Sequence, residues 1–208
     1  MRAERRRAPG SLLMTGGLLL LAAALFLTGY NLWEQRRAEQ SVSRVLEELD
    51  IAPAPAQETA DPQEAVIPDY LLAPTMEMPT EEADGKDYIG VVEIPALGLN
   101  LPVMSGWSYP DLKIAPCRYA GSAYQGDLII MAHNYRSHFG NLKNLSIGDE
   151  VVFRDVDGNE FRYEAVELET LEKTAVEEMQ AGDWDLTLFT CTVGGQTRVT
   201  VRCIEKTT

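Results

Sequence analysis

The stretch DEVVFRDVDGNEFRYEAVEL, residues 149–168, indicates which kind of fold the chain adopts. Apolar and polar residues alternate through two segments of it, and a period of two is typical of strands that bury one face. Asp157 and Gly158 separate the two segments, and an Asp-Gly pair favours the tight turn of a hairpin. The stretch therefore predicts a β-hairpin.

Strand-like composition extends in both directions from this hairpin, from Tyr88 to near the end of the chain. About seven or eight short strands with little helix between them favour an all-β fold. We therefore predict a closed or nearly closed β-barrel of about eight strands with short helices, formed by residues 85–208. The other predicted strands are YIGVVEI (88–94), LGLNLPVM (97–104), DLIIMAH (127–133), LTLFTC (186–191) and TRVTVRCI (197–204).

Residues 11–33 form an uncharged apolar run, SLLMTGGLLLLAAALFLTGYNLW. It is long enough to span a hydrocarbon core of about 30 Å as a helix, and Tyr30 and Trp33 end it as interfacial anchors do. Four arginines precede it, so the positive-inside rule predicts that residues 1–10 are cytoplasmic and that the chain after Trp33 is outside. A cleaved signal peptide is the alternative, but its apolar region spans only roughly 7–15 residues. We expect an uncleaved transmembrane anchor.

The residues between the apolar run and the barrel divide into two parts. Within residues 34–50, Val42, Val45, Leu46 and Leu49 have helical spacing, so we predict an amphipathic helix that lies against lipid or a neighbouring element. Residues 51–84 combine six prolines with many acidic residues, a composition typical of linkers. We therefore interpret residues 34–84 as an acidic, proline-containing stalk.

The overall composition excludes some function classes. A net charge of −14 opposes binding to nucleic acid. The chain has three cysteines and two histidines without the spacing of a zinc site, and its acidic residues do not form a calcium-binding loop. We therefore expect no metal and no cofactor. Outside the cell, Cys117 and Cys203 could form a disulfide and leave Cys191 free, or both could remain buried thiols.

Three residues at the ends of predicted strands could together carry out acyl transfer. Cys191 ends one strand, His133 ends another, and Arg198 begins the strand that returns after Cys191. A cysteine can attack a carbonyl, a histidine can move protons, and an arginine can donate hydrogen bonds to an oxyanion. Taken singly, such a cysteine is usually a small core residue and such a histidine a structural one, so these residues alone leave the question open.

Several segments resemble the sortase family, in the order in which that family has them. The resemblance covers residues 85–208 and also implies an N-terminal anchor. It implies that Cys191 is the nucleophile, that His133 is the catalytic histidine and that Arg198 is the catalytic arginine. The matching segments are TLFTC (187–191), which fits the TLxTC signature, IIMAHNYRSHFGNL (129–142), RVTVRC (198–203) and IGVVEIPALGLNLPV (89–103).

Alternatives remain for two of these roles. His138 follows His133 in a loop-like segment, and Arg202 lies four residues after Arg198, so both arginines should point to the same face of a strand. Closeness to Cys191 along the hairpin favours Arg198. Asn134 could orient the imidazole of His133. The loop after Cys191 is short compared with that of sortases that carry a long insertion there, so it does not identify the class. Residues 170–185 contain no long helix-sized insertion, so the chain is not a typical class B enzyme, and a class B-like or class D-like member describes it best.

The resemblance implies a membrane-anchored cysteine transpeptidase on a Gram-positive-type cell surface. Its expected partners are secreted proteins with an LPxTG-like sorting signal, an amine of a peptidoglycan precursor or a pilin, and membrane lipid, but no nucleic acid. The mechanism implied is a thioester on Cys191 that the amine resolves. Two rivals remain: a hydrolytic cysteine peptidase of the same fold, and a tethered, non-enzymatic binding domain in which Cys191 is structural.

Overall fold

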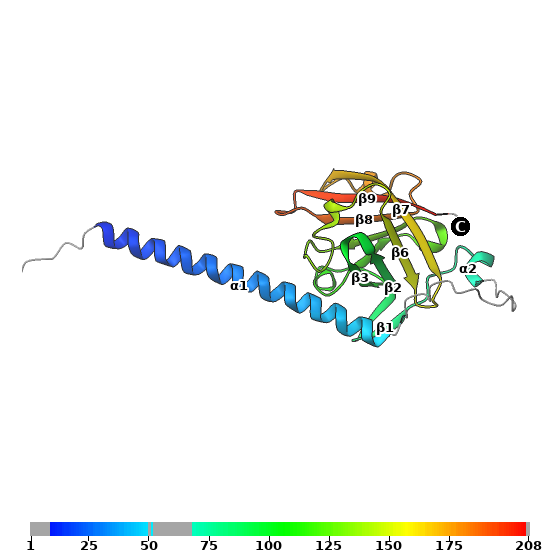
Figure 1. Ribbon diagram of the computed structural model, residues 1–208, viewed down its shortest axis with the longest axis horizontal. Helices are drawn as coiled ribbons and strands as arrows, with labels where there is room; N and C mark the ends of the chain where they lie inside the picture. Colours follow the sequence, from blue (N-terminus) through cyan, green and yellow to red (C-terminus); the bar gives the residue numbers. More distant parts are fainter. Residues whose placement is uncertain (1–8, 50, 52–67, 207–208) are drawn as a thin grey trace, which may run out of the picture. The chain divides into compact units, whose positions relative to one another are not determined.

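A computed structural model describes residues 9–49, 51 and 68–206 of the chain (Figure 1). The chain divides into two compact units, Met1–Arg37 and Ala38–Thr208. The helices are α1 (Pro9–Leu49), α2 (Asp69–Leu72) and α3 (Val176–Gln180), with single 3-10 turns at Pro95–Leu97, Asp111–Lys113, Ala123–Gln125 and Leu142–Asn144. The strands are β1 (Glu81–Ala83), β2 (Lys86–Ile94), β3 (Leu99–Met104), β4 (Cys117–Ala120), β5 (Leu128–Ala132), β6 (Glu150–Asp155), β7 (Glu160–Glu172), β8 (Leu186–Cys191) and β9 (Thr197–Glu205).

The second unit is a closed eight-stranded barrel. Its strands follow the order β2-β3-β4-β5-β8-β9-β7-β6, and the pairing of β6 with β2 closes the ring. Gly90 lies in this seam with a φ of +153°, and a Cβ there would collide with the carbonyl of Arg154. The predicted all-β barrel with short helices, preceded by an apolar helix, is confirmed.

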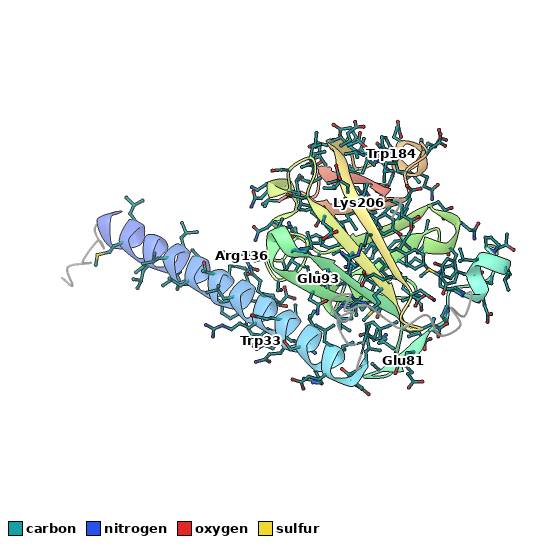
Figure 2. The ribbon with its side chains drawn as sticks, turned by 45° about the vertical axis from the view of Figure 1, so that its right-hand side comes forward. Trp33, Glu81, Glu93, Arg136, Trp184 and Lys206 are labelled. Atoms are coloured by element: carbon teal, nitrogen blue, oxygen red, sulfur yellow. The ribbon has the colours of Figure 1, made fainter. Side chains whose placement is uncertain are left out.

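The hairpin predicted for residues 149–168 is present, as β6 and β7. Val151 pairs with Tyr163 and Phe153 pairs with Phe161, and all of these side chains are buried in the main core. The same core contains inward-facing residues of β2, β3, β5, β8 and β9, and side chains fill the space that the strands enclose (Figure 2). The alternation therefore identified the buried face correctly.

Strands β1 and β4 were not anticipated from the sequence. β4 pairs with β3 through only one residue pair, Met104 with Cys117, and a register shift interrupts its pairing with β5 between Arg118 and Ala120. Such a short, irregular strand leaves no run of alternating residues to detect.

Helix α1 contains both the predicted membrane span and the predicted amphipathic extension. The range Leu13–Leu49 is long and apolar enough, by length and composition, to cross a membrane. Within the second unit, Val42, Val45 and Leu49 of α1 are buried. Val45 and Leu49 pack in a cluster with Tyr88 and other residues of the barrel unit, so the apolar stripe of this extension covers the barrel.

Residues 68–84 have linker-like composition but pack on the barrel. Tyr70 of α2 stacks on Tyr124 with ring centroids 4.7 Å apart, and Met78 is buried in the main core. β1 pairs with β2. Within the range assigned to the stalk, residues 50 and 52–67 lie outside the described residues. Apolar side chains among the acids therefore attach this segment to the barrel.

Candidate functional site

Three neighbouring strands bring the three candidate residues into one row. β5 and β8 run parallel, with Ala132 opposite Thr190, so the next residues of the two strands, His133 and Cys191, emerge side by side. β8 and β9 run antiparallel, and their register places Arg198 opposite Cys191. Adjacent strands lie about 4.8 Å apart, so Cys191 has the histidine on one side and the arginine on the other.

The strand ends are fixed by hydrogen bonds. The hydroxyl of Thr190 donates to the carbonyl of Ala132 at 2.9 Å, which ties β8 to β5 immediately before Cys191 and His133. On the other side, the loop between β8 and β9 closes through Thr192, whose N–H donates to the carbonyl of Thr197 at 2.9 Å. These bonds fix the strand ends immediately around the row.

Cys191 lies on the outer face of the barrel wall. Leu186 and Leu188 of β8 point into the main core, so Phe189 and Cys191 point outward. The Cys191 side chain is exposed and lies in a groove of about 340 Å³. The groove is lined by Trp107, Tyr109, Leu112, Lys113, Tyr119, Met131, Ala132, His133, Ala175, Val176, Met179, Phe189, Cys191 and Arg198.

The groove has an apolar floor next to a polar end formed by His133, Cys191 and Arg198. Ile129, Phe189 and Met179 form a buried cluster, against which Tyr119 and Met131 also pack. The sequence reasoning did not single out these lining residues, although a usable signal existed: Met131 and Phe189 precede His133 and Cys191 by two, so alternation places each pair on one face. The short helix α3, which forms a wall of the groove, was also missed.

The imidazole of His133 is held by the two residues that follow it. Its Nδ1 accepts the N–H of Asn134 at 3.1 Å and also lies 3.1 Å from Asn134 Oδ1. Both contacts restrain the ring from the side of Nδ1. Tyr135 stacks on the ring with centroids 4.3 Å apart and planes 4° apart.

The structure places the alternative histidine, His138, away from the groove. His138 is fully buried and is not among the groove residues. Burial, with a smaller contribution from the charge of His133, lowers the pKa of His138 to about 4. It is therefore neutral at physiological pH and has no access to a substrate in the groove.

The two arginines point to the same face of β9, but they occupy different environments. Arg198 lines the groove opposite Cys191, its guanidinium carbon lies 5.9 Å from the ring centroid of Phe189, and it donates to the carbonyl of Lys173. Arg202 is 2% exposed and pairs with Glu169 at 2.7 Å. Of the two, only Arg198 can reach a group bound at Cys191.

The other two cysteines are buried free thiols. Cys117 belongs to the cluster under the end of α1, whereas Cys203 belongs to the main core, so they lie on opposite faces of the barrel wall. β5 and β8 also separate their strands, a spacing well beyond the roughly 4.4–6.8 Å between the Cα atoms of a disulfide. Burial raises the pKa of each thiol to about 12, which leaves Cys191 as the accessible thiol.

Among the described residues, no group of three or more His, Cys, Asp and Glu side chains is arranged to hold a metal ion. The groove itself contains one histidine and one cysteine, and its two cationic residues, Lys113 and Arg198, oppose a cation there. The chemistry that the groove can support is therefore that of a cysteine nucleophile with a histidine and an arginine.

Comparison with known proteins gives a family for this arrangement. The sequence matches the sortase domain over residues 92–206, more than half of the chain. No curated protein matches it. The fold is similar to sortase A from Corynebacterium diphtheriae, with 19% identity and a TM-score of 0.54 over 59% of this chain and 62% of that chain. The matched part therefore spans less than two thirds of the Corynebacterium protein.

Two further solved structures are similar. For sortase C1 from Streptococcus suis, the identity is 27% and the TM-score 0.50, over 58% of this chain and 74% of that one. For sortase C1 from Streptococcus agalactiae, the identity is 24% and the TM-score 0.53, over 61% of this chain and 72% of that one.

Proposed function

This chain belongs to the sortase family, whose members are cysteine transpeptidases, and on that premise we propose that Cys191, His133 and Arg198 form its catalytic site. The chain would cleave an LPxTG-like sorting signal on a secreted protein and transfer the protein to an amine of a peptidoglycan precursor or a pilin. The observation that carries the proposal is the row of three side chains, on three adjacent strands, that line one groove.

The first half-reaction forms a thioester. The Cys191 thiolate attacks the carbonyl carbon of the threonine in the signal, and a new C–S bond forms as the carbonyl becomes an oxyanion. Collapse of this intermediate breaks the peptide C–N bond, and the imidazolium of His133 gives its proton to the departing amine. Asn134 and Tyr135 hold the ring in position through both protonation states.

The second half-reaction reverses the proton path. The acceptor amine attacks the thioester carbonyl, neutral His133 takes a proton from it, and the C–S bond breaks to return the thiolate. In both halves the guanidinium of Arg198 donates hydrogen bonds to the oxyanion, a role that suits its rigid arrangement of N–H groups. Its Nη1 donates to the carbonyls of Glu172 and Lys173, which restrains the guanidinium beside the groove.

The groove suits an extended peptide with an aliphatic residue. Its floor and the α3 wall are apolar, through Met131, Met179 and Phe189, and they adjoin the catalytic row. Burial of one leucine-sized side chain there contributes about 1.5–3 kcal/mol of binding. A leucine-containing signal is therefore a better match than a charged one.

We place the enzyme at the cell membrane, with α1 as a single-pass anchor, the N-terminus in the cytoplasm and the barrel outside. The apolar helix and the arginines before it support this arrangement. A shared membrane surface would raise the effective concentration of a lipid-linked acceptor near the thioester. Protease added to cells stripped of their wall should then remove the barrel, whereas protection of the barrel until lysis would reverse the orientation.

The test of function is capture of the thioester. The full-length chain in detergent is incubated with a panel of sorting peptides, and its mass is measured. We expect an acyl adduct on the parent and on a Cys117→Ala control, but none on Cys191→Ala. An adduct that persists in Cys191→Ala, or unreactive Cys191 toward a thiol probe, would remove the basis of the proposal.

Hydrolysis is the second candidate outcome, because the Cys191 side chain is exposed and water can reach a thioester there. Product analysis separates the two. Amide product that increases with added amine supports transfer, whereas free acid as the sole product at high amine concentration supports a peptidase.

A further inference from the structure

Arg202 is a buried guanidinium on the outer face of the wall, four residues after Arg198. It is 2% exposed and does not line the groove. A charged side chain is stable at such a site only when acceptors surround its donors. Four hydrogen bonds use four of its five N–H groups: Nε to Glu169 Oε1 at 2.7 Å, Nη1 to Thr187 Oγ1 at 3.0 Å, Nη1 to the Met179 carbonyl at 2.7 Å and Nη2 to the Glu178 carbonyl at 2.7 Å.

Two of these acceptors belong to α3, the short helix near the label of Trp184 in Figure 2. A helix of five residues is too short to be stable alone, and the carbonyls of its last turn have no partners within it. The guanidinium of Arg202 supplies those partners from the barrel. The side chain of Met179 adds an apolar contact, since it is 2% exposed and packs with Phe189.

The same helix is a wall of the groove. Ala175, which precedes α3, and Val176 and Met179 within it line the same groove as Cys191. Thr187, the first residue of TLFTC, is paired with Arg202 across β8 and β9, and its hydroxyl accepts from the guanidinium. The strand that ends in Cys191 and the helix that lines the groove are therefore connected through one side chain.

We propose that Arg202 is a positioning residue that fixes α3 as the wall of the groove, and so sets the affinity for the apolar part of the acyl-donor peptide. This inference rests on the proposed function. Arg202 does not touch the reacting atoms, so its loss should weaken peptide binding and leave the nucleophile intact. A lysine in its place keeps the charge but cannot bridge acceptors on β7, β8 and α3 together.

The test compares Arg202→Lys with the parent, both full-length in detergent. Binding is measured by anisotropy with a fluorescent Leu-Pro-Ala-Thr-Gly peptide in the Cys191→Ala background, and kinetics with a quenched version in the active background. We expect Kd and KM to rise about ten-fold, which is part of what burial of one aliphatic side chain contributes. The value of kcat and the rate of Cys191 alkylation by iodoacetamide should change less than about two-fold.

A second readout needs no peptide. Glu177 and Glu178 of α3 are exposed, so a glutamate-specific protease should cut there faster in Arg202→Lys than in the parent. Thr187→Val removes a single acceptor and serves as the milder variant if Arg202→Lys does not fold. Arg162→Lys makes the same substitution at an exposed arginine of β7 that does not line the groove, and it is the matched control, expected to resemble the parent in both assays.

The outcomes separate the inference from the function on which it rests. If the parent itself does not bind the peptide, the proposed signal is wrong, and faster cleavage within α3 still supports the anchoring role. If kcat falls while Kd is unchanged, Arg202 acts in the chemistry and the inference is overturned. If Arg202→Lys has the same Kd for the peptide as the parent and is cleaved within α3 at the same rate, the inference is overturned as well.

Discussion

The buried histidine of this barrel makes a quantitative prediction about stability and pH. His138 has no exposed surface, and burial lowers its pKa from 6.5 to about 4. In the unfolded chain the ring returns to its ordinary pKa. Between these two values the unfolded chain binds a proton that the folded chain does not, so the free energy of unfolding falls as the pH falls.

The magnitude follows from the size of the shift. One pKa unit corresponds to about 1.4 kcal/mol, so His138 should remove about 3 kcal/mol of stability between pH 6.5 and pH 4. Above pH 6.5 its contribution is constant, and below pH 4 it is constant again. A loss of this size is a large part of the roughly 5–15 kcal/mol that stabilises a typical domain.

The assay is urea unfolding of the full-length chain in detergent, followed by near-UV circular dichroism at pH values from 7.5 to 4. Carboxyl groups titrate in the same range, so the informative quantity is the difference between the parent and His138→Gln, which does not titrate. The variant is expected to be less stable at pH 7.5, and its disadvantage should shrink by about 3 kcal/mol by pH 4. Two parallel stability curves across this range would refute the argument.

Three other predictions follow from the site and the packing. Arg198→Lys should lower kcat for a sorting peptide by on the order of 10²–10³, because an ammonium cannot reproduce the donor geometry; a loss below ten-fold would assign the oxyanion to other donors. Tyr135→Leu should lower kcat about five-fold by releasing the ring of His133, while Tyr135→Phe keeps most activity; equal rates in both would exclude stacking as the cause. Leu49→Ala should lower the free energy of unfolding in urea by about 2–5 kcal/mol, because it removes a buried side chain of α1. Glu47→Ala, at an exposed neighbouring position, should change this free energy little. A near-zero loss in Leu49→Ala would mean that α1 does not dock on the barrel.

The strands in which apolar and polar residues alternate could be predicted from the sequence, because a strand of the barrel wall has one face toward the core and one face outward. The pattern in 149–168 is of this kind, and its inward residues are those that fill the core. β4 could not be found in this way. It is four residues long, and its partner β3 contacts it through one pair, so tertiary packing and not local pattern creates it.

The linker-like segment shows the limit of composition as a guide. Prolines and acids dominate its sequence, yet Tyr70 and Met78 attach its described part to the barrel. Single apolar residues in a polar stretch leave no periodic signal, because each fills a gap that other elements create. Whether Cys117 and Cys203 form a disulfide could not be predicted for a similar reason. The register of distant strands decides on which face of the barrel wall each cysteine lies.

The two arginines of β9 show most clearly what spacing can and cannot specify. Alternation places Arg198 and Arg202 on one face, about 13 Å apart along the strand. Hairpin closeness favours Arg198 as the partner of Cys191, and the observed register sets them opposite each other. Nothing in the sequence indicates that Arg202 meets α3, because that contact depends on the path of residues 173–185 over the wall. One face of β9 therefore has two separate roles. Arg198 lies beside the groove at the strand end, where it can donate to a developing charge. Arg202, four residues further along the strand, donates to carbonyls of α3, the helix that forms a wall of the groove. A substitution at the first position should change the rate of the reacting complex, and one at the second should change how often that complex forms.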